Sequence, residues 1–232
     1  MRDNLIQIRS FGAGFYALRD SNGIHLIDCG FIGGVQMLHR ALRKRGWGKD
    51  PILGIIVTHG HLDHILNVSR IAAETGAWIA APRHDAAHYE GNPTYHGAAK
   101  VTGFLESAGR PVLGFKPFTT SRLLEDGDTM DVWHGLTVVH LPGHTAGHSG
   151  FYSHRLRWLF CADLFASYGG LSHFPPHFLN MDSKQAYESA SRALELDLAG
   201  VLPSHADGAS PEVHLQRLKK LVERQSGDMV KP

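Results

Sequence analysis

The chain has 232 residues, of which 43% are apolar and 19% charged, an ordinary balance for a globular protein that buries a sizeable core. Its 23 basic and 22 acidic residues leave a net charge of +1, so neither a strongly basic nucleic-acid surface nor an acidic disordered tail is expected. The unusual number is 17 histidines, because histidine is the side chain most used for metal ligation and for proton transfer near neutral pH.

The N-terminal part of the chain alternates between strand and helix patterns. Short runs of β-branched and aromatic residues predict strands at Leu5–Arg9, Phe15–Arg19, Ile24–Asp28, Leu53–Val57 and Trp78–Ala81. Apolar residues at helical spacing predict helices at Val35–Arg45 and Asp63–Thr75. Two glycines, Gly12 and Gly14, form the expected turn between the first two strands.

The C-terminal part starts less regularly and then resumes the alternation. Residues 82–128 contain one expected helix, Ala98–Ser107, and Pro111 is expected to prevent regular structure beyond it. Further strands are predicted at Met130–Trp133, Leu136–Leu141, Phe151–Ser153, Arg157–Cys161 and Gly200–Leu202. Amphipathic helices are predicted at Lys184–Leu196 and Pro211–Gln225. No low-complexity linker interrupts the chain, so we expect one α/β domain over residues 1–232.

Several function classes lack their sequence signatures. The chain has no Walker A loop, no G-x-G-x-x-G, no G-x-S-x-G and no H-E-x-x-H, which argues against the nucleotide, dinucleotide, α/β-hydrolase and zincin chemistries. Cys29 and Cys161 form no C-x-x-C pair, and both lie in apolar strands, where buried free thiols are expected. With no secretory signal or membrane-spanning run recognised, we expect a cytoplasmic protein without a membrane partner.

One segment concentrates potential metal ligands. The sequence Thr58-His59-Gly60-His61-Leu62-Asp63-His64 follows the buried strand LGIIV and precedes a predicted helix. Such a turn at a strand end can point alternate side chains into one cavity, and Gly60 permits close backbone packing there. Imidazoles and a carboxylate suit zinc, manganese or iron. The segment therefore predicts a metal site.

Three further candidate ligands also stand at strand ends. His144 lies in the segment LPGHTAGH, Asp163 ends FCAD, and His205 ends LPSH. Each residue alone would more often be structural, but the combination with the first cluster gives seven candidate ligands at corresponding positions. This pattern indicates a shared metal centre, and His148 is expected to support the His144 loop by hydrogen bonds.

These motifs together resemble the metallo-β-lactamase superfamily. The resemblance rests on T-H-x-H-x-D-H, P-G-H-T-x-G-H, the strand-end Asp163 and the final S-H, in the order of that family, and on Ile27–Gly30, which is similar to its I-D-T-G strand. It covers roughly residues 5–210. The implied fold is a four-layer αβ/βα sandwich with metal ions at the edge of two facing sheets.

The resemblance also implies a role for each residue of the motifs. A first metal site is implied for His59, His61 and His144, and a second for Asp63, His64 and His205, with Asp163 as the bridging carboxylate. Asp28 is implied to support the site by orienting a ligand, a role that imidazole ligands require. The implied cofactors are two divalent metal ions, zinc first, with iron and manganese as alternatives.

The resemblance implies a dinuclear hydrolase that uses a metal-bridged hydroxide on a small carbonyl substrate: a thioester, a lactone or an amide. Asp63 would orient the attacking solvent or accept its proton. Asp163 stands where clinical β-lactamases of the family usually carry cysteine, which favours the glyoxalase II and lactonase type. The apolar and aromatic segment 165–182 is expected to border the substrate, and Tyr168 could hydrogen-bond a substrate carbonyl.

Alternative functions remain open at this point. The same scaffold occurs in mononuclear iron thiol or persulfide dioxygenases, in nucleases and phosphodiesterases, and in proteins with a non-enzymatic binding role. The near-zero net charge argues against nucleic acid as a partner, so a small-molecule substrate is expected, and a homodimer is possible. Metal analysis would separate the first two enzymes, because zinc near two per chain is expected for the hydrolase and iron near one for the dioxygenase.

Overall fold

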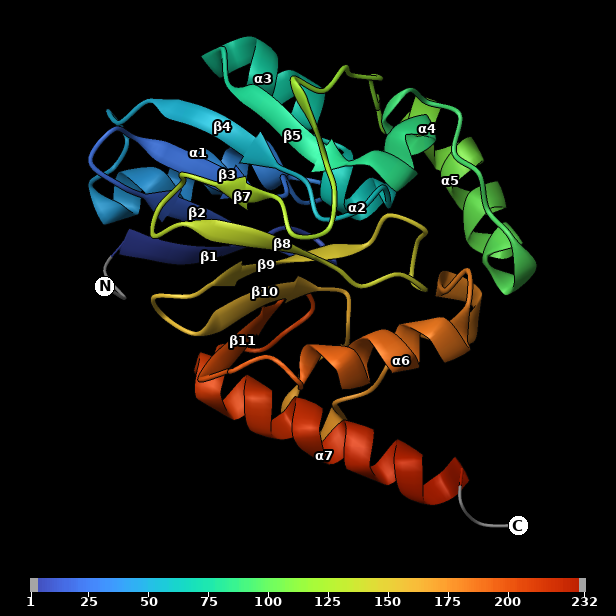
Figure 1. The fold of residues 1–232 in the computed structure, drawn as a ribbon. Coiled ribbons are helices and arrows are strands. Elements are labelled where there is room, and N and C mark those ends of the chain that lie inside the picture. The colour runs from blue at the N-terminus through green and yellow to red at the C-terminus, as the bar shows by residue number, and fades with distance from the viewer. Residues whose placement is uncertain (1–3, 230–232) are drawn as a thin grey trace.

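The computed structural model, which describes residues 4–229, stacks two β-sheets between outer helices (Figure 1). The first sheet has the strand order β1-β2-β3-β4-β5-β6 and the second the order β11-β10-β9-β8-β7. The strands of the first sheet are β1 (Leu5–Arg9), β2 (Gly14–Arg19), β3 (Ile24–Ile27), β4 (Ile52–Ile56), β5 (Trp78–Pro82) and β6 (Arg122–Leu124). Those of the second are β7 (Thr129–Met130), β8 (Leu136–His140), β9 (Ser149–Ser153), β10 (Trp158–Ala162) and β11 (Gly200–Pro203).

Helices cover the outer faces of both sheets (Figure 1). The α-helices are α1 (Gly34–Arg45), α2 (Leu62–Ile65), α3 (Val68–Thr75), α4 (Ala86–Tyr89), α5 (Lys100–Val112), α6 (Ser183–Ala193) and α7 (Pro211–Met229). Short 3₁₀ turns are η2 (Arg83–Asp85), η3 (Gly97–Ala99), η4 (Gly169–Leu171) and η5 (His177–Leu179). Helices α1 and α3 pack on the first sheet, and α6 and α7 pack on the second.

Three apolar layers hold this sandwich together. Strand β2 illustrates the alternation, because Phe15 and Ala17 face the helical layer while Tyr16 and Leu18 face the second sheet. The layer between the sheets joins these residues to side chains of the other sheet such as Phe160. The predicted αβ/βα four-layer fold is confirmed by this arrangement.

The strand directions decide where the polar motifs meet. Strands β3 to β6 run parallel, as do β10 and β11, so their carboxyl ends point to common edges of the sheets. Asp28 follows β3, Asp163 follows β10, and His205 lies two residues after β11. Cys29 and Cys161 are buried free thiols, as expected.

Three predicted elements differ from the structure. The helix expected at Asp63–Thr75 is divided into α2 and α3, and Asn67 between them donates its side-chain amide to the carbonyls of residues 29–31 at 2.7–3.1 Å. The strand expected at Met130–Trp133 ends at Met130, and Trp133 has a left-handed backbone (φ 59°) incompatible with a strand.

Over residues 4–229, no helix combines the length and apolar character needed to cross a membrane.

The predicted helix at Ala98–Ser107 extends to Val112, beyond the expected break at Pro111. Glu106 and Arg110 are buried on this helix and form an ion pair at 3.0 Å. These two side chains also bond to the backbone of Leu62, within the predicted ligand segment, and of His88, so tertiary contacts hold the last turns in helical form. Pro111 is accommodated in the final turn.

Candidate metal centre

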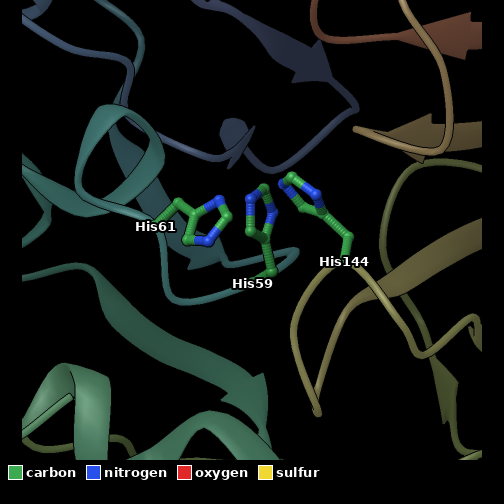
Figure 2. Close-up of side chains that lie close together, drawn as sticks. All are labelled: His59, His61 and His144. Carbon is green, nitrogen blue, oxygen red and sulfur yellow. The ribbon is translucent and has the colours of Figure 1, made fainter. Parts of the chain in front are cut away.

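Three buried histidines form the first cluster (Figure 2). His59 and His61 come from the turn after β4, and His144 comes from the turn after β8. One ring nitrogen of each lies within 4.8 Å of the others. The rings converge although the two turns are more than 80 residues apart in the sequence (Figure 2). This arrangement could hold a metal ion.

A second cluster adjoins the first. It consists of Asp63, His64, Asp163 and His205, whose candidate ligand atoms also lie within 4.8 Å of one another. His64 is fully buried, whereas the side chains of Asp63 and His205 are 30% and 25% exposed. The second cluster is therefore the more open of the two.

Asp163 contacts both clusters. Its Oδ2 lies 3.4 Å from Nε2 of His144 in the first cluster and 3.1 Å from Nε2 of His205 in the second. Its Oδ1 lies 3.2 Å from Nε2 of His64. The structure thus brings all seven predicted ligands together, with the carboxylate of Asp163 next to a histidine of each cluster.

Asp28 and Thr58 orient two of the imidazoles from behind. Thr58 donates its backbone N–H and its hydroxyl to the Asp28 carboxylate at 2.8 and 2.7 Å, so its oxygen accepts from Nδ1 of His59 at 3.0 Å. Asp28 also accepts from Nδ1 of His64 at 2.8 Å. Asp28 has a left-handed backbone (φ 62°), which turns the chain out of β3 at this point. The predicted supporting position of Asp28 matches these contacts.

Asn180 holds the third imidazole in the same way. Its Oδ1 accepts from Nδ1 of His144 at 2.8 Å. With Nδ1 engaged, Nε2 of His59, His64 and His144 is in each case buried without a hydrogen-bond partner. Buried polar atoms normally have partners, so these bare nitrogens, two in the first cluster and one in the second, are suited to ligating a cation in each cluster.

Burial and charge divide the two clusters electrostatically. Burial lowers the pKa of His59 and of His61 well below the ordinary value for histidine, so both imidazoles are neutral and able to ligate. The carboxylate of Asp163 raises the pKa of His205 to about 11. Burial opposes a charge on His64 as well, but Asp163 and Asp63 outweigh it and raise its pKa. His59 and His61 of the first cluster are therefore neutral, whereas the second cluster is charge-paired.

Asp85 joins the two loops that carry the first cluster. It is fully buried and accepts from Gly60 N at 2.8 Å, from the Thr145 hydroxyl at 2.6 Å and from Gly147 N at 2.7 Å. Gly60 lies between His59 and His61, and a Cβ there would come within 2.5 Å of the buried His88 ring. The close packing expected at Gly60 is present.

Helix α5 supports the same turn from outside. Glu106 accepts from Leu62 N at 2.7 Å, and Arg110 donates to the carbonyl of His88 at 2.9 Å. The ring of Tyr95 stacks on His61 with 5.8 Å between centroids.

His148 donates Nδ1 to the Leu141 carbonyl at 2.8 Å, which is the supporting role expected for it.

A cavity of about 260 Å³ opens beside Asp163 and His205. Tyr168, which is 40% exposed, lies in its wall. Phe165 and Leu179 also line it, whereas the neighbouring Phe178 is largely exposed. A larger groove of about 550 Å³ between α7 and residues 169–172 contains none of the predicted ligands.

The sequence did not indicate Asp85, Glu106 or Asn180. For Asp85 a signal was present, because it follows β5 at the same sheet edge as Asp28 after β3 and the ligands after β4. Glu106 lies in an exposed-looking helix, and Asn180 in an irregular segment. Nothing in their local patterns distinguishes them from solvated polar residues.

Comparison with known proteins places this fold and site in a family. The sequence pattern described as "Metallo-beta-lactamase superfamily" matches residues 15–205, so the chain belongs to that superfamily. A hydroxyacylglutathione hydrolase from Aeromonas salmonicida is 31% identical over 118 residues, which are 50% of this chain and 34% of the relative. The aligned segment therefore spans about a third of that relative's length.

Solved structures show the same fold. A metallo-beta-lactamase family protein from Thermus thermophilus superposes with a TM-score of 0.74 at 19% identity, covering 97% of this chain and 80% of that protein. A second protein, solved in a di-iron-bound form, gives a TM-score of 0.68 at 24% identity, with coverages of 91% and 96%. Sequence identities this low show that the fold is shared, but they do not identify the reaction.

Proposed function

We propose that this protein is a dinuclear metal-dependent hydrolase acting on a small carbonyl substrate, namely a thioester, a lactone or an amide. The observation that carries the proposal is the position of Asp163, whose carboxylate lies 3.4 Å from His144 and 3.1 Å from His205. A carboxylate within reach of two ligand clusters is suited to bridging two ions. Membership of the superfamily and the similarity to a hydroxyacylglutathione hydrolase support a thioester among the candidates.

The donor set supports zinc as the first choice of metal. Zinc takes imidazole nitrogens and carboxylate oxygens, and three neutral or deprotonated donors with an open position are typical of its catalytic sites. The bare Nε2 atoms of His59, His61 and His144, which together form the first cluster, fit such a group. Iron is also bound by imidazole and carboxylate ligands, and a structural neighbour was solved in a di-iron form. The experiment must therefore also identify the bound metal.

Bound divalent ions would supply Lewis acidity, lowering the pKa of water toward neutrality and polarising a carbonyl oxygen. Asp63 is assigned to orient the attacking water. Burial alone would raise the pKa of Asp63, but His64 and His205 hold it below the ordinary value, so the carboxylate is ionised and can accept a hydrogen bond. Its 30% exposure gives it access to solvent, unlike the buried ligands behind it.

Elemental analysis with a subsequent substrate panel tests the proposal. The isolated protein should hold close to two zinc ions per chain and hydrolyse at least one thioester, lactone or amide. His144→Ala should lose metal and activity together, whereas His154→Ala, which changes an exposed histidine away from both clusters, should lose neither. Iron near one per chain with oxygen-dependent turnover of a thiol, or a fully loaded protein inert across the panel, would refute it.

A further inference from the structure

The cavity beside the second cluster is predominantly apolar. Its walls, apart from the predicted ligands Asp163 and His205, consist of Phe165, Ala166, Tyr168, His173, Pro175, Pro176 and Leu179. The exposed His173 donates Nδ1 to the adjacent Phe174 carbonyl at 2.8 Å, so that nitrogen is already used. Walls of this kind stabilise hydrocarbon and offer little to an anionic group.

Backbone pairing preforms this cavity. Ala166 and His173 exchange two backbone hydrogen bonds of 2.8 and 3.1 Å, and Ser167 N donates to the carbonyl of His205 at 2.8 Å. The wall is therefore fastened directly to a predicted ligand. A preformed cavity binds a chain without first ordering its own walls.

Asn180 connects the opposite wall to the first cluster. It donates Nδ2 to the Pro175 carbonyl at 3.1 Å while its Oδ1 holds His144. The cavity wall and the ligand geometry thus share one side chain. A substrate group in the cavity lies at a fixed position relative to both clusters.

We propose that this cavity, defined by Phe165, Pro175, Pro176 and Leu179 and called here the acyl pocket, binds the unbranched acyl chain of a medium-length acyl substrate. The inference rests on the proposed hydrolase function and names the substrate class. At about 30 Å³ for each water-sized group, its 260 Å³ accommodates roughly eight such groups, which corresponds to an acyl chain of about six to eight carbons.

The charge that develops in the reaction assigns the acyl chain to this pocket. Water adds to the carbonyl carbon, the bond to the leaving sulfur, oxygen or nitrogen breaks, and the leaving atom takes up the electron pair and then the proton that the attacking water gives up. An apolar wall disfavours that growing negative charge, so the leaving atom should face the solvent-open side of the site, away from the wall. The uncharged acyl chain then enters the pocket.

A thioester series tests the assignment on the zinc-loaded protein. With one common thiol, kcat/KM should rise about two- to fourfold for each methylene added to the acyl group, up to about eight carbons, and then stop rising. Acetyl esters of progressively longer thiols should show no comparable trend. A flat acyl profile, or a length dependence carried by the thiol instead, would overturn the inference.

Variants locate the effect in the pocket. Leu179→Trp should fill it and move the preferred acyl length down by at least two carbons, with zinc content unchanged. Leu171→Trp is the matched control, since Leu171 lies on the same segment but is 78% exposed and lines no part of the pocket. An unchanged preference in Leu179→Trp, or an equal shift in Leu171→Trp, would overturn the assignment.

An equilibrium measurement separates this inference from the proposed function. Octanamide should bind both zinc-free and zinc-loaded protein in calorimetry, at least tenfold more tightly than acetamide, and Leu179→Trp should abolish the difference. If no acyl compound is hydrolysed but octanamide binds at least tenfold more tightly than acetamide, the proposed function is refuted and the assignment of the acyl pocket is supported. Hydrolysis without length dependence and without octanamide binding overturns the pocket alone.

Discussion

Asp85 offers the sharpest test of how the centre is held together. Its carboxylate accepts three hydrogen bonds that connect the loop of His59 and His61 to the loop of His144. Asp85→Ala would leave the N–H groups of Gly60 and Gly147 buried without partners, at about 1–3 kcal/mol each. A total of about 2–6 kcal/mol is a large part of the 5–15 kcal/mol typical of a folded domain.

The milder change is Asp85→Asn. The remaining carbonyl oxygen can still accept from Gly147, and the Thr145 hydroxyl can reverse to accept from the new amide. Gly60 N–H, however, would then face another donor, so one bond is lost and unfolding should become easier by about 1–3 kcal/mol. Because the two ligand loops would be less firmly joined, zinc affinity should fall about 10- to 100-fold.

Two assays measure these effects separately. Urea unfolding of the zinc-free protein measures the stability change, and competition against a chromophoric chelator measures zinc affinity. Asp126→Asn is the matched control, since Asp126 accepts one backbone bond from His140 at 2.7 Å in an exposed turn. It should change neither quantity appreciably. Zinc affinity of Asp85→Asn within twofold of the unaltered protein would refute the reasoning, even if stability fell.

Three further predictions concern the ligands and the fold. Asp63→Ala should lower kcat by about 100-fold or more, because it removes the residue assigned to orient water, as steady-state kinetics will measure. Asn180→Ala should weaken zinc binding about tenfold, because Nδ1 of His144 loses its acceptor, and chelator competition will detect this. Burial lowers the pKa of His25 in the folded protein. Below about pH 6.5 His25 is therefore protonated in the unfolded chain before it is protonated in the folded protein. Unfolding free energy should therefore fall from pH 7 to pH 5, and less so in His25→Gln, as urea titrations at each pH will show.

Each of these predictions has its own contradicting outcome. A purified Asp63→Ala protein with full activity and full metal content would remove Asp63 from the mechanism. Asn180→Asp keeps an acceptor beside His144 and should restore binding; equal losses in both variants would count against the orienting role. For His25, identical pH slopes in the variant and the unaltered protein would show that its burial does not govern stability in this range.

Much of the fold could be predicted because its patterns are local. The continuous apolar runs at Leu53–Val57 and Phe15–Leu18 are typical of strands that are buried on both faces, and they can be recognised without any distant residue. The boundary at Asn67 could not be predicted. Its amide reaches three carbonyls of the segment after β3, and such a contact has no trace in the local sequence.

The candidate ligands were recognisable for a related reason. His59, His61 and Asp63 stand a few residues apart directly after a buried strand, and His144, Asp163 and His205 each follow another strand. Strand ends of a sheet meet at one edge, so chain order and strand assignment suffice to bring such residues near one another. The sequence by itself therefore determined which candidate donors are present and the sheet edge on which they lie.

Only the tertiary structure decided how those donors are held and what lies beside them. The acceptors behind the imidazoles, Asn180 and Asp28, and the clamp at Asp85 come from elements far apart in sequence, so their contacts depend on how layers pack. The same holds for the difference between the neutral imidazoles of His59 and His61 and the charge-paired second cluster, because burial and the position of Asp163 set it. The acyl pocket likewise exists only where residues 165–179 fold back over the end of β11. Local pattern fixes which groups are available, whereas packing fixes their distances, and the chemistry of a site depends on distances.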